Sequence, residues 1–339
     1  MLDYPTLRSV LSDMGEPELR ARQAYHAVSR SLVTSFDQAT ALPASLRGRL
    51  ARRLSVVDLE ERRTLRSPDG SAIKTLFAAA DGLPIEAVQL TSGTRVTVCV
   101  STQVGCAVGC VFCASGRLGL RRDLRAGEIA DQVLHFERLL RADGRRVTNV
   151  VLMGMGEPFH NYDQSLGACR LLNHADGFGL AARSISISTA GVVPGIRRFT
   201  AEPEQFNLAV SLHAGTDDVR DRLVPLNRRY PLHELLAACA AYVRRRRRKL
   251  FFEYVLLPGV NDGPEQVAAL GRRLARPLYH LNLIGYNRTD DRFPAPSPAD
   301  VRSFAADVRA AGVACTVRHS PGREIEAACG QLALRESPC

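Results

Sequence analysis

The sequence lacks several features that would place it in particular protein classes. No stretch of about 18 consecutive apolar residues occurs in its 339 residues, which argues against a membrane-spanning helix and a membrane partner. Charged residues interrupt the N-terminal segment, so we expect no cleaved leader and a cytoplasmic location. There is no internal repeat and no low-complexity tract. The composition, 45% hydrophobic and 24% charged, is typical of a globular protein.

Lysine is scarce, although the chain is strongly basic. Lys and Arg number 45 against 35 acidic residues, which gives a formal net charge of +10 at pH 7. A surplus of this size favours a polyanionic partner, because basic side chains release the counterions of phosphates on binding. An arginine-rich coding bias explains the surplus equally well. The densest basic run is RRRRRK at residues 244–249. Most such runs are solvated helix faces, and contact with a polyanionic partner is the alternative for this one.

The nine cysteines do not suggest a disulfide framework, because they are unevenly spread in a chain that we expect to be cytosolic. Three of them, Cys106, Cys110 and Cys113, fall within one short stretch, and Cys99 precedes that stretch by seven residues. Thiolates at this spacing on one loop can converge on a single metal centre. Metal binding or catalysis is therefore the better hypothesis for this part of the chain.

The number of clustered thiols distinguishes between metal centres. Structural zinc normally takes four Cys or His ligands, and no second close pair exists, since His135 and His160 stand alone. A 4Fe–4S cluster usually takes four cysteines. Three cysteines leave one iron with an open position, and that position can bind a substrate.

Periodicity predicts two kinds of region. Residues 1 to about 60 are expected to be helical with a break at Pro43, and strands with turns at 68–70 and 81–82 follow. After residue 90, short apolar strands alternate with amphipathic helices such as 127–142, which predicts an α/β fold with a parallel sheet. The strand candidates are 95–101, 148–155, 184–188, 206–212, 250–257, 279–286 and 314–320. In such folds the chemistry lies at the carboxyl ends of the strands.

The CxxxCxxC pattern, set directly after a strand, resembles the radical S-adenosylmethionine superfamily, and Phe112 beside the last cysteine fits its common aromatic position. Four further motifs make the resemblance narrower. They are QAYHAVSRSLVTSFDQATALP, CVSTQVGC, GMGEP and AACGQL, and together they resemble the RlmN/Cfr family of RNA methyltransferases along essentially the entire chain. The resemblance implies a partial (β/α)6 TIM-like barrel at 91–325, a mostly helical, RNA-facing accessory domain at 1–90, and a C-terminal segment at 326–339.

The family methylates carbon 2 or carbon 8 of an adenosine in 23S ribosomal RNA, and these electron-poor ring carbons cannot attack a sulfonium methyl. The resemblance therefore implies radical chemistry with one 4Fe–4S cluster on Cys106, Cys110 and Cys113, and two S-adenosylmethionine molecules per turnover. It also implies an electron donor such as flavodoxin, and we expect a monomer. Pro158 in GMGEP favours methylation of carbon 2, and the carbon-2 branch of the family can also act on adenosine in transfer RNA. By contrast, CASGRLGL and LYHLNLIGYN resemble the carbon-8, antibiotic-resistance branch.

The family motifs give catalytic roles to three residues. Cys329 in AACGQL matches the cysteine that carries the methyl group, and Cys99 matches the one that attacks its sulfur, forming a transient disulfide and releasing the RNA. Glu86 in LPIEAVQL matches the general base that removes the ring proton. From the residues alone, Cys99 would be a small strand residue, Cys329 an inert thiol, and Glu86 a carboxylate on a solvated strand face.

The resemblance also implies a cofactor site. Gly156 and Glu157 in GMGEP match the segment that binds the amino end of S-adenosylmethionine, where glycine permits close backbone approach and a carboxylate accepts from the ammonium group. The remaining matched contacts are Ser188, Ser211, Leu212, His213 and Asn287. We expect no role for Cys169, Cys239, Cys315 or Cys339.

Two alternatives of other classes remain open at this point. An RNA-binding protein with a structural metal centre would hold a redox-silent metal and would not need Cys329. A different radical enzyme, such as a cofactor-maturation protein, would not need Cys99, Glu86 and AACGQL together.

Overall fold

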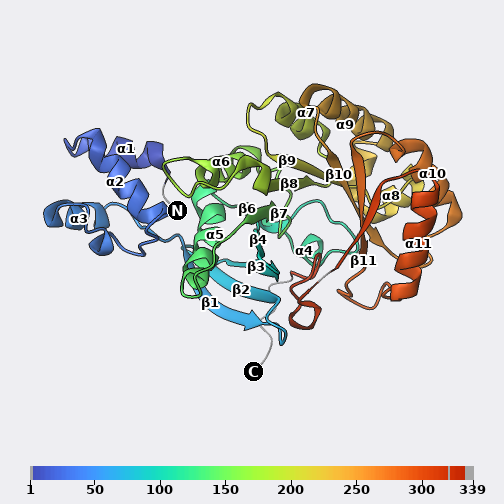
Figure 1. The fold of residues 1–339 in the computed structure, drawn as a ribbon, viewed down its shortest axis with the longest axis horizontal. Helices are drawn as coiled ribbons and strands as arrows, with labels where there is room; N and C mark the ends of the chain where they lie inside the picture. The colour runs from blue at the N-terminus through green and yellow to red at the C-terminus, as the bar shows by residue number, and fades with distance from the viewer. Residues whose placement is uncertain (1–2, 320, 333–339) are drawn as a thin grey trace.

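A ten-stranded mixed sheet organises the computed structural model, which describes residues 3–319 and 321–332 (Figure 1). The strand order is β1-β2-β3-β4-β7-β8-β9-β10-β11-β12. From β4 onward all neighbouring strands are parallel. These parallel strands are β4 (Arg95–Cys99), β7 (Asn149–Leu152), β8 (Ile185–Thr189), β9 (Asn207–Ser211), β10 (Leu250–Leu256), β11 (Tyr279–Gly285) and β12 (Cys315–Arg318). They match the seven predicted strands with ends shifted by a few residues.

Each parallel crossover contains at least one helix, because the apolar strands must be covered. The helices are α5 (Ala126–Arg141), α6 (Tyr162–Asn173), α7 (Val193–Ala201), α8 (Asp217–Leu223), α9 (Leu232–Arg246), α10 (Pro264–Leu274) and α11 (Pro298–Ala310). The stripe predicted on α5 is buried at Ile129, Val133 and Phe136. Six strand–helix units followed by β12 form a partial barrel, as predicted. No helix of the described residues combines the length and apolarity needed to cross a membrane.

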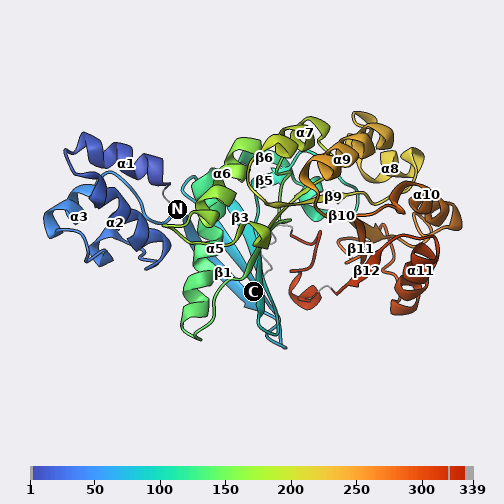
Figure 2. The same ribbon diagram turned by 45° about the horizontal axis from the view of Figure 1, so that its top comes forward.

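The N-terminal region has a helical part and a strand part. Helices α1 (Tyr4–Asp13), α2 (Glu18–Ser29) and α3 (Ala44–Ala51) form a group at one end of the molecule in both ribbon views (Figures 1 and 2). Helix α3 begins directly after Pro43, where a break was predicted. Short 3-10 helices lie at Phe36–Gln38, Ala182–Ser184, Pro225–Arg228 and Arg323–Ile325.

Strands β1 (Leu59–Arg66), β2 (Ala72–Ala79) and β3 (Pro84–Ser92) are antiparallel, and β3 pairs with β4. Their turns lie at the predicted positions, where Gly70 and Gly82 have positive φ. These three strands therefore extend the barrel sheet. The domain boundary that we predicted near residue 90 falls inside β3, so the accessory strands share one sheet with the core.

A small hairpin that the sequence analysis missed carries the first clustered cysteine. Strands β5 (Gln103–Cys106) and β6 (Gly119–Asp123) pair in a separate two-stranded sheet, with α4 (Ala114–Arg117) between them. A Cβ on Gly105 would lie 1.8 Å from the carbonyl oxygen of Gly119, so only glycine fits this crossing. The strands are short and their residues are mostly small or charged, so they show no clear alternation.

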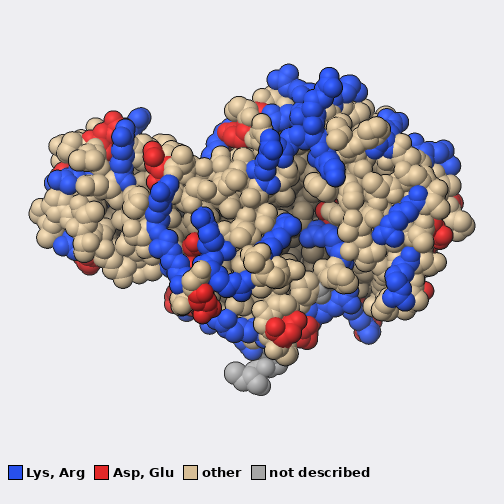
Figure 3. Space-filling model, in the orientation of Figure 1, with Lys and Arg blue, Asp and Glu red and all other residues tan. Residues whose placement is uncertain are grey.

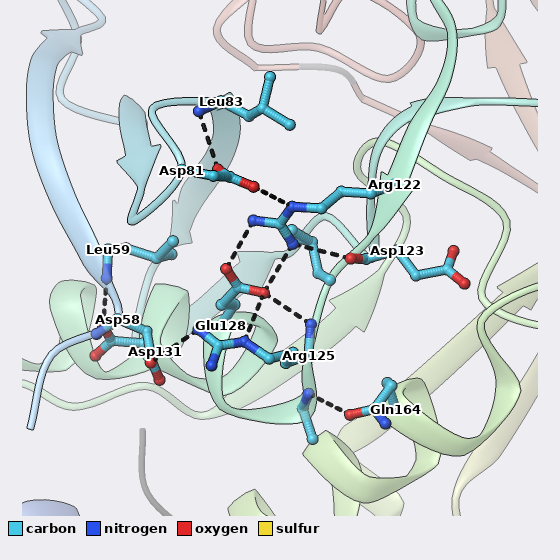
Figure 4. Close-up of polar contacts among 12 residues, drawn as sticks. Asp58, Leu59, Asp81, Leu83, Arg122, Asp123, Arg125, Glu128, Asp131 and Gln164 are labelled. Atoms are coloured by element: carbon cyan, nitrogen blue, oxygen red, sulfur yellow. Dashed lines mark hydrogen bonds and ion pairs between the residues drawn. The ribbon is translucent and has the colours of Figure 1, made fainter. Parts of the chain in front are cut away.

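Arg122 on β6 fixes this hairpin to two other elements (Figure 4). Its guanidinium donates to both carboxylate oxygens of Glu128 on α5 at 2.9 and 3.0 Å, and to Asp81 in the β2–β3 turn at 2.5 Å. Burial alone would raise the pKa of Glu128, but Arg122 and the backbone N–H of Arg125 together lower it. The charged Glu128 thus connects the cysteine-bearing hairpin to the barrel wall.

Candidate active site

Two adjoining cavities lie at the carboxyl ends of the parallel strands. The larger, here called the strand-end cavity, encloses about 960 Å³ and is lined by residues that follow β5, β7, β8, β9 and β11. This volume includes space that is open to solvent. The smaller, here called the thiol cavity, encloses about 640 Å³ and is lined by residues of β3, β4 and the C-terminal segment. Eight residues line both, among them Cys113, Arg318 and Cys329.

The structure brings the three predicted cluster ligands to the wall of the strand-end cavity. Cys106 ends β5, Cys110 lies in the following loop, and Cys113 precedes α4. A Cβ on Gly116 would lie 3.0 Å from the backbone N and O of Cys110, so a glycine there lets the loop pack closely. No three His, Cys, Asp or Glu side chains of residues 3–319 and 321–332 are grouped as a single-ion site.

Burial dominates the electrostatics of these thiols. Burial raises the pKa of Cys106 to about 12 and the pKa of Cys110 well above its usual value. Such thiols lose their protons only to a strongly positive partner, and metal ions deprotonate coordinating thiols in this way. Three convergent thiols on one cavity wall therefore fit an iron–sulfur cluster held by three cysteines.

Glu157 is buried in the strand-end cavity and already accepts two backbone hydrogen bonds. Its carboxylate oxygens accept from the N–H of Ala190 at 2.6 Å and of Phe159 at 2.9 Å. Burial raises the pKa of Glu157 to about 7, although these bonds oppose the rise. An ammonium group in the cavity would favour the ionised carboxylate. Gly156 beside it has φ of +101°, and a Cβ there would lie 2.6 Å from Cβ of Gln103.

The loop after β9 separates the three residues predicted there. Ser211 and His213 line the strand-end cavity, whereas the Leu212 side chain is fully buried in the core outside the lining. Burial lowers the pKa of His213 to about 3, so its ring is neutral. Its Nδ1 accepts from the N–H of Val255 at 3.0 Å, which leaves the ring proton on Nε2. Phe112 packs edge-on against this ring with centroids 4.7 Å apart.

Ser188 and Asn287 also line the strand-end cavity, as predicted. Asn287 Nδ2 donates to the backbone carbonyl of Cys329 at 3.2 Å, which links the cavity to the C-terminal segment. Two more bonds hold that segment: Ala114 N–H donates to the carbonyl of Gly330 at 2.9 Å, and Ser115 Oγ donates to that of Leu332 at 2.7 Å. The Cys329 segment thus rests on the loop that carries the clustered cysteines.

The thiol cavity contains both predicted redox cysteines. Cys99, the last residue of β4, is buried, and Cys329 faces it with a solvent-accessible surface. Burial raises the pKa of Cys99 to about 12, and the nearby Cys329 adds to this rise. Burial also raises the pKa of Cys329, an effect that Arg318 opposes. Both thiols are free in the structure, so their predicted disulfide stays a prediction.

Glu86 lies on β3, two residues before the cavity-lining Val88 and on the same face of the strand. Its side chain is only 2% exposed, which excludes the alternative of a solvated strand face. It forms an ion pair of 3.2 Å with Lys74 of β2. The carboxylate is not among the residues that line either cavity.

Two charged residues at the site were not predicted by any sequence motif. Arg318 lines both cavities and pairs with Glu253 at 3.1 Å. Arg220 is fully buried and donates to the carbonyls of Ala190, Ser211 and Leu212, so it shapes two loops of the strand-end cavity. Their sequence positions, at the end of a short strand and within a helix, give no indication of this convergence.

The remaining predictions have mixed outcomes. Cys169 and Cys239 are core residues and Cys315 is buried, consistent with no role at the site, and Cys339 lies outside the described residues. The RRRRRK run ends α9 and precedes β10, so it lies at the amino ends of the strands, opposite the cavities. Arg245 donates to the carbonyl of Thr200 at 3.2 Å and Arg248 to Asn207 Oδ1 at 2.6 Å. Part of the run therefore binds the neighbouring loop.

A partial barrel with three clustered cysteines at its strand ends defines a radical S-adenosylmethionine enzyme. The model of that superfamily matches residues 100–271. The fold is similar to a solved radical S-adenosylmethionine methyltransferase from Sphaerobacter thermophilus, with 48% identity, a TM-score of 0.95, and coverage of 98% of this chain and 97% of that one.

Curated relatives define the family within this superfamily. A probable dual-specificity RNA methyltransferase RlmN of Chloroflexus aurantiacus is 45% identical, with 98% of this chain and 91% of the relative covered. The dual-specificity RNA methyltransferase RlmN 1 of Myxococcus xanthus is 43% identical, with 98% and 92% covered. The chain belongs to the RlmN family of radical S-adenosylmethionine RNA methyltransferases. This membership removes both the non-enzymatic and the maturation-enzyme alternatives.

Proposed function

We propose that this enzyme methylates carbon 2 of an adenosine in 23S ribosomal RNA by way of a methyl group carried on Cys329, with two S-adenosylmethionine molecules consumed per turnover. One observation carries the proposal: Cys329 lines both the strand-end cavity and the thiol cavity. A carrier must receive its methyl group in one place and deliver it in another. A residue that lies on the shared wall of two cavities meets this requirement.

The strand-end cavity suits the cofactors. Cys106, Cys110 and Cys113 would hold a 4Fe–4S cluster, and Glu157 would accept from the ammonium group of S-adenosylmethionine. The bound cluster supplies the electron for reductive cleavage of this cofactor, and a donor such as flavodoxin would reload it. Neutral His213 and the hydroxyls of Ser188 and Ser211 contribute uncharged hydrogen-bonding groups for the remainder of the molecule.

The chain's own residues perform the later steps in the thiol cavity. Joining the methyl carbon of Cys329 to the adenine ring leaves one surplus electron on the ring, which the bound cluster would take back. Glu86 accepts the proton of that ring carbon. Cys99 then attacks the sulfur of Cys329, so that an S–S bond forms while the S–C bond breaks. The departing carbon takes up a proton and becomes the product methyl group. A thiol reductant must reopen the disulfide before the next turnover.

The surface is compatible with an RNA partner. Lys and Arg side chains are spread over the face in Figure 3 and flank its central hollow. They would contact phosphates, which position folded RNA without reading its sequence. Adenosine in transfer RNA is a second substrate under this proposal, in keeping with the dual specificity in the names of the relatives. We further propose that the enzyme is a cytoplasmic monomer.

The test is mass spectrometry of the protein as purified and after reaction with unmodified 23S ribosomal RNA. Wild-type protein should carry one methyl group on Cys329. The Cys99→Ala variant should retain RNA covalently on Cys329, because resolution of the adduct is blocked. Cys315→Ala is the matched control, since this buried thiol lines neither cavity, and it should release its product normally. Unmodified Cys329 in every sample would contradict the proposal.

The nucleoside released from the wild-type reaction assigns the methylated atom. We expect 2-methyladenosine on digestion of the product RNA. Detection of 8-methyladenosine instead would place the enzyme with the Cfr antibiotic-resistance type, with the same carrier residue. This measurement is independent of the Cys99 experiment, since it needs only completed turnovers.

A further inference from the structure

Lys74 is a buried cation next to the residue that we assign as the general base. The chain contains two lysines, Lys74 and Lys249, and Lys74 has a side chain only 8% exposed. Its Nζ lies 3.2 Å from Oε1 of Glu86 and donates to the backbone carbonyl of Glu326 at 3.3 Å. One ammonium group therefore contacts both the base and the segment that carries Cys329.

Strand register explains how Lys74 reaches this place. Lys74 of β2 is opposite Val88 of β3, and Val88 is opposite Cys99 of β4. Opposed residues in antiparallel strands point to the same face, so Lys74, Val88 and Cys99 form a row across three strands. Glu86 lies on that same face, two residues before Val88 on β3. The accessory strands thus bring Lys74 and Glu86 to the same sheet face as Val88 and Cys99, which line the thiol cavity.

The C-terminal segment packs directly on Lys74's strand. A Cβ on Gly322 would lie 2.7 Å from Cβ of Ala72, and Ala327 N–H donates to the carbonyl of Gly322 at 2.8 Å. The segment therefore turns tightly on β2, and Lys74 contacts its end at Glu326. Three residues later the chain reaches Cys329. The position of the base and the position of the methyl carrier are coupled through one side chain.

A stabilising role alone is a weak explanation for this pair. Removing two charges from water costs about as much as their attraction returns, so a buried ion pair contributes little net stability compared with apolar residues. The ammonium group of Lys74 can point separate N–H groups at a carboxylate and a carbonyl. The geometry suits orientation of a carboxylate rather than strengthening of a core.

We propose that Lys74 is a positioning residue for proton removal. It holds the Glu86 carboxylate in one orientation and ties that orientation to the docked Cys329 segment. This inference rests on the proposed function, in which Glu86 accepts the ring proton. In this role Lys74 acts through Glu86 and is not itself the acceptor of the ring proton.

The test uses the full-length, cluster-loaded enzyme with unmodified 23S ribosomal RNA under single-turnover conditions. Product release should be at least about tenfold slower in Lys74→Met, a part of the roughly 10²- to 10⁴-fold that a general base supplies. The covalent protein–RNA adduct should accumulate in this variant. Lys74→Arg, which keeps the charge, should recover at least part of the rate. Lys249→Met, at the other and exposed lysine, should behave as wild type.

A double-variant cycle separates positioning from a structural effect. If Lys74 acts through Glu86, adding Lys74→Met to Glu86→Gln should change the release rate by less than about twofold. An equal slowing in both backgrounds, or a Lys74→Met variant as fast as wild type, would overturn the inference. If Lys74→Met alone fails to fold because it strands the Glu86 charge, the double variant carries neither charge and still allows comparison with Glu86→Gln.

The same samples distinguish failure of the inference from failure of the proposed function. Methylation of Cys329 in the wild type, measured by peptide mass spectrometry, tests the proposed function alone. If Cys329 is methylated and product forms, but Lys74 has no effect through Glu86, then only the role of Lys74 is rejected. If wild-type Cys329 carries no methyl group, the underlying function fails first.

Discussion

The strand-end cavity and the thiol cavity share Cys329 but are built in different ways. The walls of the first come from successive loops of parallel strands, which any barrel of this kind gathers at one edge. The walls of the second include part of this same lining, to which β3, β4 and the C-terminal segment are added, and they are mostly apolar around the two thiols. The first cavity thus follows from the fold of the superfamily, and the second depends on additions to that fold. We infer that general cofactor chemistry belongs to the first and the particular methyl transfer to the second.

The largest effect should come from breaking the strand-end cavity. Cys110→Ser should remove the cluster and abolish both Cys329 methylation and RNA methylation, because both steps depend on this cavity under our proposal. Iron content and visible absorbance after anaerobic reconstitution give the first readout, and product analysis gives the second. Cys169→Ser, in the core away from the cavities, is the matched control and should bind iron normally. Full activity in the Cys110 variant would contradict the assignment of the cluster to the strand-end cavity.

A pH titration should affect only the strand-end cavity. Burial raises the pKa of Glu157 to about 7, so the carboxylate is ionised above that pH and protonated below it. The ammonium group of S-adenosylmethionine requires the ionised form. Affinity for the cofactor should therefore fall by about tenfold per pH unit as the pH drops below about 7, and level off above it.

Equilibrium binding to the anaerobic, cluster-loaded enzyme measures this dependence. Glu157→Gln should bind weakly and with a flat profile, because no proton is exchanged. Glu265→Gln, an exposed position on α10, should keep the wild-type profile. A wild-type profile that rises toward acid pH would show that Glu157 does not meet the ammonium group.

A smaller effect is expected at the boundary between the cavities. Arg318 opposes the raised pKa of the Cys329 thiol and is paired with Glu253. Replacing it in Arg318→Met should slow methylation of Cys329 by about threefold to tenfold, because less of the thiol is ionised. Arg302→Met, exposed on α11, provides the control. The measurement is the rate at which the protein incorporates a methyl group in the absence of RNA. An unchanged rate would show that Arg318 does not promote methylation of Cys329.

The smallest effect should come from the RRRRRK run. Its exposed members lie at the amino ends of the strands, and others bind the end of α7 and the start of β9. The triple change Arg244→Glu, Arg247→Glu and Lys249→Glu should alter RNA affinity by less than about twofold at fixed salt. A large loss of affinity, with a shallower salt dependence, would show that RNA also contacts the barrel at the amino ends of its strands.

The two cavities also differ in how much of them the sequence could predict. Cys106, Cys110 and Cys113 form a local motif, and Glu157, Ser188 and His213 lie at or shortly after the carboxyl ends of apolar strands, so strand-end rules place them together. Cys99 and Cys329 are far apart in sequence and were connected only by family resemblance. Leu212 differs from its two neighbours, because its side chain is buried in the core while theirs line the cavity.

Charged partners were the least predictable part. Lys74, Arg220 and Arg318 each meet a partner that is distant in sequence, and strand register or loop packing decides the meeting. The β5–β6 hairpin was missed for a related reason, since its strands are short and its form depends on the close crossing of Gly105 and Gly119. Periodicity detects apolar faces, and it contains no information on which ions will lie together.

The most direct test of the central claim is a single-turnover isotope experiment on Cys329. Enzyme whose Cys329 carries an unlabelled methyl group is mixed with unmodified 23S ribosomal RNA and S-adenosylmethionine with a deuterated methyl group. We predict that the first RNA product contains the unlabelled carbon from Cys329, while the deuterated methyl group appears on the protein. A first product that contains the deuterated methyl carbon would contradict the account, because the methyl group would then have bypassed Cys329.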